Sequence, residues 1–494
     1  MTTIRLKKAQ ARNHEWSMAQ PVDFALEEGE HIAIVGANGS GKTMLVDMIT
    51  GRHPVFPDMA EYHFANNRPL VSENIRYIAF RDTYGGDNDR TYFLQQRWNQ
   101  MEIDAETPTA GEKLEEAFHM AGRDSAERRR LQQHIYTLFH MDELLDKYII
   151  LLSSGELRKL KLAASLFSNP QVLIIDNPFI GLDAETRSQL NELLTLLQAD
   201  GTLQIVLVLS KSDEIPNFIT HVVEVSSMTV TSKLPRHDYE ARRSPIPAHV
   251  LSDTLRQQIL SLPINESDTP APGSQEVIGF NHVSIRYGER TILKDLDWQV
   301  MNGQCWMLTG QNGAGKSTLL SLVCADNPQA YACDITLFGH RRGTGESIWE
   351  LKRHIGYVSP EMHRSYHRDI NALSIVASGL KDTVGLYVKA TADEQQQCRW
   401  WMRVFGIEHL VNRSFLRMSS GEQRLVLLAR AFVKDPDLLI LDEPLHGLDL
   451  RNRRMAKDVI EAFCQRPNKT LVFVSHYKEE RPACIDHEIF LYRR

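Results

Sequence analysis

With 494 residues, the chain is longer than most single compact domains, so two or three domains are expected. Its hydrophobic content of 42% and charged content of 24% are ordinary for a globular protein with sizeable cores. The formal net charge of -7 argues against a protein that is held on nucleic acid by a general excess of positive charge, so a nucleic-acid partner is not expected.

The N-terminus and the cysteines indicate the compartment. The N-terminus lacks the apolar core typical of a signal peptide, and no apolar run has the length that a membrane span needs. We therefore expect a cytoplasmic protein that acts at the inner face of a membrane only as a peripheral component. The cysteines lack the spacing typical of metal ligands, and we expect reduced core thiols at Cys305, Cys324, Cys333, Cys398, Cys464 and Cys484.

The first motif in chain order is a phosphate-binding loop. Residues 32–35 (IAIV) predict a buried strand that runs into G-x-x-x-x-G-K-T, and a helical pattern follows at once. In this context, backbone N–H groups and the positive helix end surround the phosphates, Lys42 reaches the β and γ phosphates, and the Thr43 hydroxyl ligates Mg²⁺. The predicted nucleotide-binding residues are Gly36, Ala37, Asn38, Gly39, Ser40, Gly41, Lys42 and Thr43.

The second motif is a buried strand, VLIID, which ends at Asp176. A carboxylate at the carboxyl end of such a strand can hold the magnesium shell. The next residue is Asn177, which can form hydrogen bonds but cannot accept a proton. After the following strand (IVLVL) comes Lys211, which can pair with phosphate as a point charge.

Proline, serine and mixed charge fill residues 234–275, which we interpret as a linker with one short helix. This linker separates a first repeat, residues 1–233, from a second repeat, residues 276–494. The two repeats are duplicated domains, because HIAIVGANGSGKTMLVDMITG recurs as CWMLTGQNGAGKSTLLSLVCA. In both repeats a serine of an SSGE motif also stands 23 residues before the motif aspartate.

The second repeat carries the same motifs with a full catalytic set. Asp442 and Ser317 repeat the magnesium ligands, and Glu443 is suited to polarise the attacking water as a general base. His476, after the strand LVFV, can sense the γ-phosphate and orient that water. The predicted nucleotide-binding residues are Gly310, Gln311, Asn312, Gly313, Ala314, Gly315, Lys316, Ser317 and Thr318. Because the first repeat has lost both catalytic groups, we expect it to bind nucleotide but to hydrolyse it weakly.

LSSGE (residues 152–156) and MSSGE (residues 418–422) resemble the LSGGQ signature of the ABC ATPase family. The resemblance covers almost the whole chain apart from the linker. It implies an α/β fold with two tandem P-loop NTPase domains, each with a RecA-like core and a helical subdomain near residues 60–150 or 325–415. It also implies that ATP and Mg²⁺ are bound and that ATP is hydrolysed.

The same resemblance implies how the two sites are completed. In this family each nucleotide lies between the P-loop of one domain and the signature of the other. Ser153, Ser154 and Gly155 would then complete the competent site, and Ser419, Ser420 and Gly421 would cap the degenerate one. We expect a monomer in which the two domains close on each other as a pseudo-dimer.

Two further family positions are less regular in this chain. Tyr287 matches the adenine-stacking aromatic of the family in the second repeat. The first repeat offers Trp16, for which an adenine-stacking role and an ordinary core position are both open. The glutamine that the family places near residue 360 is missing, and Ser359 or Glu361 stands there.

Three roles are compatible with these motifs. We favour the ATPase of a transport system with separate membrane-spanning subunits, of the molybdate type by resemblance of residues 335–359 (ITLFGHRRGTGESIWELKRHIGYVS). A regulatory or DNA-repair switch is the second possibility, since closure driven by nucleotide serves both. Action on ribosomes is the third, and the short linker without basic character disfavours it.

Overall fold

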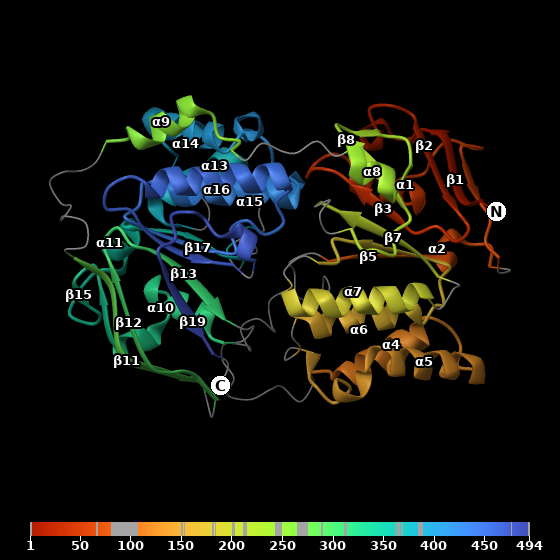
Figure 1. The fold of residues 1–494 in the computed structure, drawn as a ribbon, viewed down its shortest axis with the longest axis horizontal. Helices are drawn as coiled ribbons and strands as arrows, with labels where there is room; N and C mark the ends of the chain where they lie inside the picture. The colour runs from red at the N-terminus through yellow and green to blue at the C-terminus, as the bar shows by residue number, and fades with distance from the viewer. Residues whose placement is uncertain are drawn as a thin grey trace. The chain divides into compact units, whose positions relative to one another are not determined.

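The computed structural model describes residues 2–65, 68–80, 107–149, 152, 154–179, 182, 184–199, 203–210, 215–242, 249–263, 275–287, 290–310, 314–360, 362, 366, 369–383, 389–475 and 477–492. The chain divides into two compact units (Figure 1). The first contains the described residues up to 242, and the second contains those from 249 onward.

The first unit holds a mainly parallel sheet in the strand order β10-β8-β3-β7-β6-β5, with β9 paired to β8, and a small antiparallel sheet in the order β2-β1-β4. Every residue of the strands β3, β6 and β7 is buried, because helices and the second sheet cover this sheet. The strands are β1 Thr2–Ala9, β2 Val22–Glu27, β3 Ile32–Val35, β4 Ala60–Tyr62, β5 Ile75–Ala79, β6 Val172–Asp176, β7 Gln204–Leu209, β8 His221–Ser226, β9 Thr229–Val230 and β10 Leu234–Pro235.

The second unit repeats this arrangement. Its parallel sheet has the order β16-β17-β18-β13-β19, and its antiparallel sheet has the order β12-β11-β14-β15. The strands are β11 Glu276–Tyr287, β12 Arg290–Met301, β13 Cys305–Gly310, β14 Asp334–Leu337, β15 His340–Arg341, β16 Ile355–Val358, β17 Leu438–Asp442, β18 Thr470–Val474 and β19 His487–Leu491.

The parallel order of the two units is the same. Strands β5-β6-β7-β3-β8 of the first correspond to β16-β17-β18-β13-β19 of the second. All neighbours in these two series run parallel. The sequence repeat is therefore a repeat of the fold, and in each unit the carboxyl ends of these strands meet at one edge, where α/β sheets bind ligands.

Helices complete each unit, and several begin where the sequence supplies a cap. Thr109 and Glu112, and likewise Thr391 and Glu394, form reciprocal capping boxes at the starts of α4 and α14. The helices of the first unit are α1 Lys42–Ile49, α2 Val71–Asn74, α4 Ala110–Met120, α5 Ala126–Phe139, α6 Ser154–Leu166, α7 Ala184–Ala199 and α8 Arg236–Arg242. Those of the second are α9 Asp253–Leu260, α10 Lys316–Val323, α11 Ile348–Arg353, α13 Ala372–Ser378, α14 Ala392–Val404, α15 Ser420–Phe432 and α16 Leu450–Cys464.

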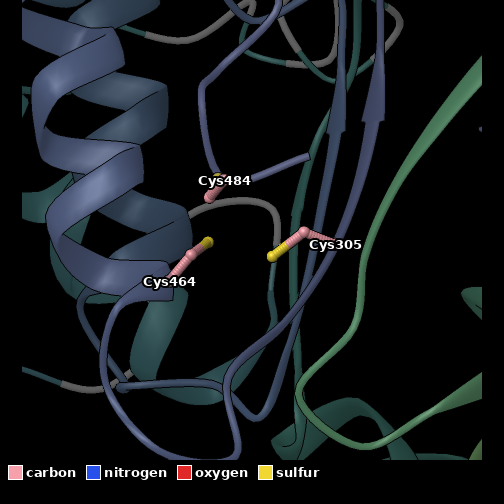
Figure 2. Close-up of side chains that lie close together, drawn as sticks. All are labelled: Cys305, Cys464 and Cys484. Atoms are coloured by element: carbon pink, nitrogen blue, oxygen red, sulfur yellow. The ribbon is translucent and has the colours of Figure 1, made fainter. Parts of the chain in front are cut away.

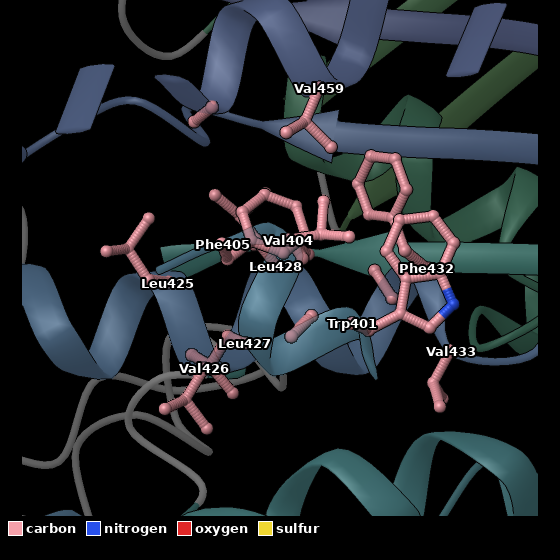
Figure 3. Packing of buried hydrophobic residues seen from close by; sticks show 14 of the residues in the cluster. Trp401, Val404, Phe405, Leu425, Val426, Leu427, Leu428, Phe432, Val433 and Val459 are labelled. Atoms are coloured by element: carbon pink, nitrogen blue, oxygen red, sulfur yellow. The ribbon is translucent and has the colours of Figure 1, made fainter. Parts of the chain in front are cut away.

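The core of the second unit forms around Trp401 of α14, which is 1% exposed (Figure 3). Its ring lies 5.2 Å from that of Phe432 on α15, and Phe432 contacts Phe463 on α16 edge to face at 4.9 Å. These aromatic contacts join three successive α-helices of the second unit. The expected helical subdomains are present, with α4 and α5 in the first unit and α13 and α14 in the second.

The segment expected to be a linker contributes elements to both units where it is described. β10 pairs with β8, and α8 follows it in the first unit. Helix α9 belongs to the second unit, because Ile259 is fully buried in that core and Leu255 packs against it. Apolar residues on α9 thus attach part of the expected linker to the core of the second unit.

Candidate nucleotide-binding sites

The first P-loop folds around its own lysine. Strand β3 carries the chain to the sheet edge, and α1 begins at Lys42 directly after Gly41, which adopts a left-handed φ of 106°. The buried Lys42 Nζ donates hydrogen bonds to the carbonyl oxygens of Gly36 at 2.7 Å and Ala37 at 2.8 Å. The ammonium group therefore lies at the loop, and Thr43, in the first turn of α1, is exposed. Asn38, Gly39 and Ser40 lie in the described part of the same loop.

The second P-loop has the same construction. Helix α10 begins at Lys316 after Gly315, whose φ is 95°, and Lys316 Nζ donates to the Gly310 carbonyl at 2.7 Å. Ser317 is exposed on the first turn, whereas Ala314 and Thr318 are buried behind the loop. Gln311, Asn312 and Gly313 lie outside the described residues.

The two motif aspartates lie at the same sheet edge as the P-loops. Asp176 ends β6 and Asp442 ends β17, and both are less than a tenth exposed. One strand separates each of them from the P-loop strand of its own unit. The Tyr77 hydroxyl of β5 donates to Asp176 Oδ2 at 2.9 Å. Sequence reasoning missed Tyr77, since only the pairing of β5 with β6 brings it to the aspartate.

The residue after each aspartate has the same backbone geometry in both units. Asn177 has a φ of 52° and Glu443 a φ of 49°. Each donates its backbone N–H to the neighbouring strand, Asn177 to Val208 at 2.9 Å and Glu443 to Val474 at 3.0 Å. The two side chains therefore start from equivalent positions, and the difference between the sites at this point is chemical.

The contacts of these two side chains differ. The Ser210 hydroxyl donates to Asn177 Oδ1 at 3.2 Å. In the second unit Glu443 Oε2 lies 3.8 Å from Nδ1 of the buried His446. The sequence carried a signal for His446, because EPLHGLD has histidine where NPFIGLD has isoleucine.

His476 and Lys211 lie outside the described residues, but the neighbours of His476 are described. The buried Ser475 hydroxyl donates to Glu480 Oε2 at 2.7 Å and accepts from the Tyr477 N–H at 3.1 Å. Glu480 Oε1 in turn lies 3.9 Å from the Arg453 guanidinium on α16. These contacts, which we call the Ser475 brace, hold the chain on both sides of His476.

Among the described residues of the first unit, Ser210 and Ile215 do not form the corresponding contacts. Ser210 corresponds to Ser475, since each directly follows the equivalent strand, but the position five residues later is Ile215 instead of a glutamate. Ser210 is bonded to Asn177 instead. This is a third difference between the repeats, and it is visible in the sequence as S-x-x-x-x-E against S-x-x-x-x-I.

The second signature forms the start of α15. Ser419 caps this helix, with its hydroxyl accepting from the Glu422 N–H at 3.3 Å, and Ser420 and Gly421 form the first turn. In the first repeat Ser153 lies outside the described residues, and Ser154 begins α6. A Cβ on Gly155 would approach Thr186 Cγ2 to 2.4 Å, so a larger residue there would force the Thr186 side chain on α7 to move. The pairing of each signature with the P-loop of the other repeat stays a prediction.

The remaining sequence candidates lie as follows. Tyr287 is the last residue of β11, and its side chain is outside the described residues. Trp16 is 37% exposed and stacks on His53 with 4.5 Å between ring centroids, so the core position considered for it is wrong. Ser359 is buried, and its hydroxyl accepts from the Met362 N–H at 3.1 Å, while Glu361 is not described.

Comparison with known proteins shows the family to which this fold belongs. The sequence model of the ABC transporter family matches residues 19–180 and 293–446. The chain is 34% identical to the ABC transporter ATP-binding protein ModF of Escherichia coli (strain K12), over 99% of this chain and 96% of that protein. It is also 30% identical to an uncharacterized ABC transporter ATP-binding protein of Schizosaccharomyces pombe, over 94% of this chain and 93% of that protein.

Solved structures share the fold at lower sequence identity. An archaeal ribosome recycling factor, crystallised with a ribosomal stalk protein, has a TM-score of 0.51 and 17% identity, covering 94% of this chain and 83% of that one. A structure named RNase-L Inhibitor also has a TM-score of 0.51 and 17% identity, covering 98% of this chain and 87% of that one. At this identity the likeness concerns the fold alone.

The part of the chain that the structure describes contains no helix with the length and apolar character to cross a membrane. Two P-loops, two motif aspartates and two signature helices stand on duplicated sheets, and the family match covers both copies. The chain therefore belongs to the ABC transporter ATP-binding family, and it is an ATPase with two cassettes.

Proposed function

We propose that this protein hydrolyses ATP at one site and holds ATP at the other. The observation that carries the proposal is the shared backbone position of Asn177 and Glu443, each at a φ near 50° and each bonded to the neighbouring strand. A carboxylate there can accept a proton from water, whereas an amide cannot. The competent site uses Glu443 and His476 as catalytic residues.

Each site takes Mg²⁺ with its nucleotide in this proposal. The hydroxyls of Thr43 and Ser317 are exposed on the first turn after the P-loop lysine, and Asp176 and Asp442 lie at the same edge. Hydroxyl and carboxylate oxygens are the ligands that Mg²⁺ prefers, so the donor set fits this ion. Mg²⁺ would neutralise charge on the β and γ phosphates, while the lysines bind the same phosphates.

The cassettes would close head to tail. Ser153, Ser154 and Gly155 then complete the site of Lys316, and Ser419, Ser420 and Gly421 cap the site of Lys42. Support comes from the position of Ser420 and Gly421 on the first turn of α15, where backbone N–H groups at a helix N-terminus attract an anion. Tyr287 would stack on adenine in the competent cassette.

For the cellular role we favour the ATPase component of a transport system whose membrane-spanning subunits are separate chains. Support comes from the 34% identity to ModF over 99% of this chain. Cargo recognition then belongs to the partner subunits, and the molybdate type expected from the sequence is part of the proposal. The protein would act in the cytoplasm, as a peripheral component of the membrane.

Membrane association tests this role. The Glu443→Gln protein, tagged and loaded with ATP, is floated with native membranes through a density gradient, beside a parallel run over a ribosome cushion. The transport proposal expects flotation with membranes that is lost after extraction with detergent-free alkali, as for a peripheral protein. Pelleting with ribosomes, or failure to associate with membranes, would overturn it in favour of a ribosomal role or a free regulatory switch.

A further inference from the structure

Three cysteines that are far apart in the sequence meet in the second cassette (Figure 2). Cys305 begins β13, Cys464 ends α16, and Cys484 lies shortly before β19. Their sulfur atoms all lie within 4.8 Å of one another. The expectation of ordinary core thiols does not account for three sulfurs this close to one another.

Hydrogen bonds outside the sulfurs hold this arrangement in place. Cys305 donates its N–H to Asp486 Oδ1 at 2.9 Å, and Asp486 donates its own N–H to the Cys305 carbonyl at 3.0 Å. Ala483, next to Cys484, donates its N–H to Glu461 Oε1 at 2.7 Å, and Glu461 lies on α16 one turn before Cys464. The backbone segments that carry the three sulfurs are therefore positioned before any ligand binds.

We propose that Cys305, Cys464 and Cys484 form a binding site for one Zn²⁺ ion. A Zn–S bond of about 2.3 Å with tetrahedral angles places sulfur ligands about 3.8 Å apart. Sulfurs within 4.8 Å of one another reach that spacing by side-chain rotation alone. Cys305 is buried, while Cys464 and Cys484 are partly exposed, and a water molecule is the expected fourth ligand.

Charge and stoichiometry favour Zn²⁺ over the other uses of clustered thiols. Three thiolates with Zn²⁺ leave one negative charge, whereas Cu⁺ would leave two beside the carboxylates of Asp486 and Glu461. A disulfide would join only two of the three sulfurs.

The ion would act on structure and not on the chemistry of ATP. Cys305 is at the amino end of β13, and the P-loop begins at Gly310 at its carboxyl end, about 16 Å away along the strand. Zn²⁺ would tie together the start of β13, the end of α16 and the segment before β19. Its binding is thus expected to raise the melting temperature and to leave nucleotide binding unchanged.

The test is a metal titration of the full chain, reduced and freed of metal with EDTA. Zn²⁺ is titrated in competition with a chromophoric chelator, and Co²⁺ is added separately to detect thiolate-to-cobalt charge transfer. We expect one tight Zn²⁺ per chain, with binding weakened at least about tenfold in Cys464→Ser and Cys484→Ser. The control Cys333→Ser changes a cysteine of the same cassette outside the cluster, and it should bind like the parent.

Alkylation supplies a second measurement in case a serine variant folds poorly. In the unaltered chain, Zn²⁺ should protect Cys464 and Cys484 from iodoacetamide, as read by mass spectrometry, and leave Cys333 unprotected. Absence of saturable Zn²⁺ binding, equal protection of Cys333, or unchanged affinity in both serine variants would overturn the proposal. A disulfide found between two of the three cysteines in the protein as isolated, before any reductant is added, would overturn it as well.

Discussion

The substitution Glu443→Gln, compared with Asn177→Gln, tests the asymmetry of the two cassettes. Both changes are made at the same backbone position of the repeat, but only Glu443→Gln removes a group that can accept a proton. Glu443→Gln replaces a proton acceptor by an amide of the same shape. Asn177→Gln keeps an amide and lengthens it, which breaks the 3.2 Å hydrogen bond from Ser210.

The expected magnitudes are well separated. A general base contributes about 100- to 10,000-fold to a rate. At about 1.36 kcal/mol for each factor of ten, this is about 2.7–5.4 kcal/mol of lost transition-state stabilisation for Glu443→Gln. The Ser210 bond lost in Asn177→Gln contributes about 0.5–1.5 kcal/mol to the stability of the first cassette, and no step of hydrolysis depends on it.

The assay measures steady-state phosphate release together with the binding of a fluorescent ATP analogue. Glu443→Gln should lose at least about 99% of kcat, which corresponds to the roughly 100-fold lower end of the expected range. Its nucleotide affinity should stay within about threefold of that of the parent. Asn177→Gln should keep most of the kcat. Similar losses in the two variants would refute the assignment of hydrolysis to one site, and loss of nucleotide binding in Glu443→Gln would show that its effect is not that of a base.

Three further predictions concern the site and the core. Ser475→Ala should lower kcat about tenfold with KM unchanged, because two buried hydrogen bonds beside His476 are lost. The matched change Ser210→Ala should have little effect on kcat. Equal effects of the two variants on kcat would contradict the role given to the Ser475 brace. Lys316→Ala should abolish turnover in the phosphate assay. Lys42→Ala should lower the number of nucleotides bound per chain from two towards one. An unchanged number in Lys42→Ala would contradict a binding role for the first site. Trp401→Ala should lower the unfolding free energy of the second cassette by about 3–5 kcal/mol in urea, and a loss below about 1 kcal/mol would argue against its place in the core.

Local motifs made most of the fold and the P-loops predictable. A strand, a glycine-rich loop and a helix stand within 20 residues, and their duplication predicted two cassettes that the strand orders confirm. Asp176 and Asp442 could be placed because they end strands that are hydrophobic throughout, which is typical of a parallel sheet.

The features that sequence reasoning missed depend on contacts between distant segments. Tyr77 reaches Asp176 only because β5 pairs with β6, and nothing near Tyr77 in the sequence indicates that neighbour. The three clustered cysteines are separated by 159 and 20 residues, and their meeting depends on how α16 and β13 pack. Trp16 was ambiguous for a similar reason, since its partner His53 is supplied by another loop.

The backbone at the residue after each motif aspartate gives a physical reason to regard Glu443 as functional. A φ near 50° lies in the left-handed region, which asparagine enters more readily than glutamate. Asn177 therefore suits its position conformationally, whereas Glu443 holds the same conformation at a cost of about 1 kcal/mol. Local stability alone would favour asparagine in both cassettes. The second cassette nevertheless has glutamate at this position, next to His446 and the Ser475 brace. A requirement for a carboxylate in proton transfer explains why the more strained residue stands there.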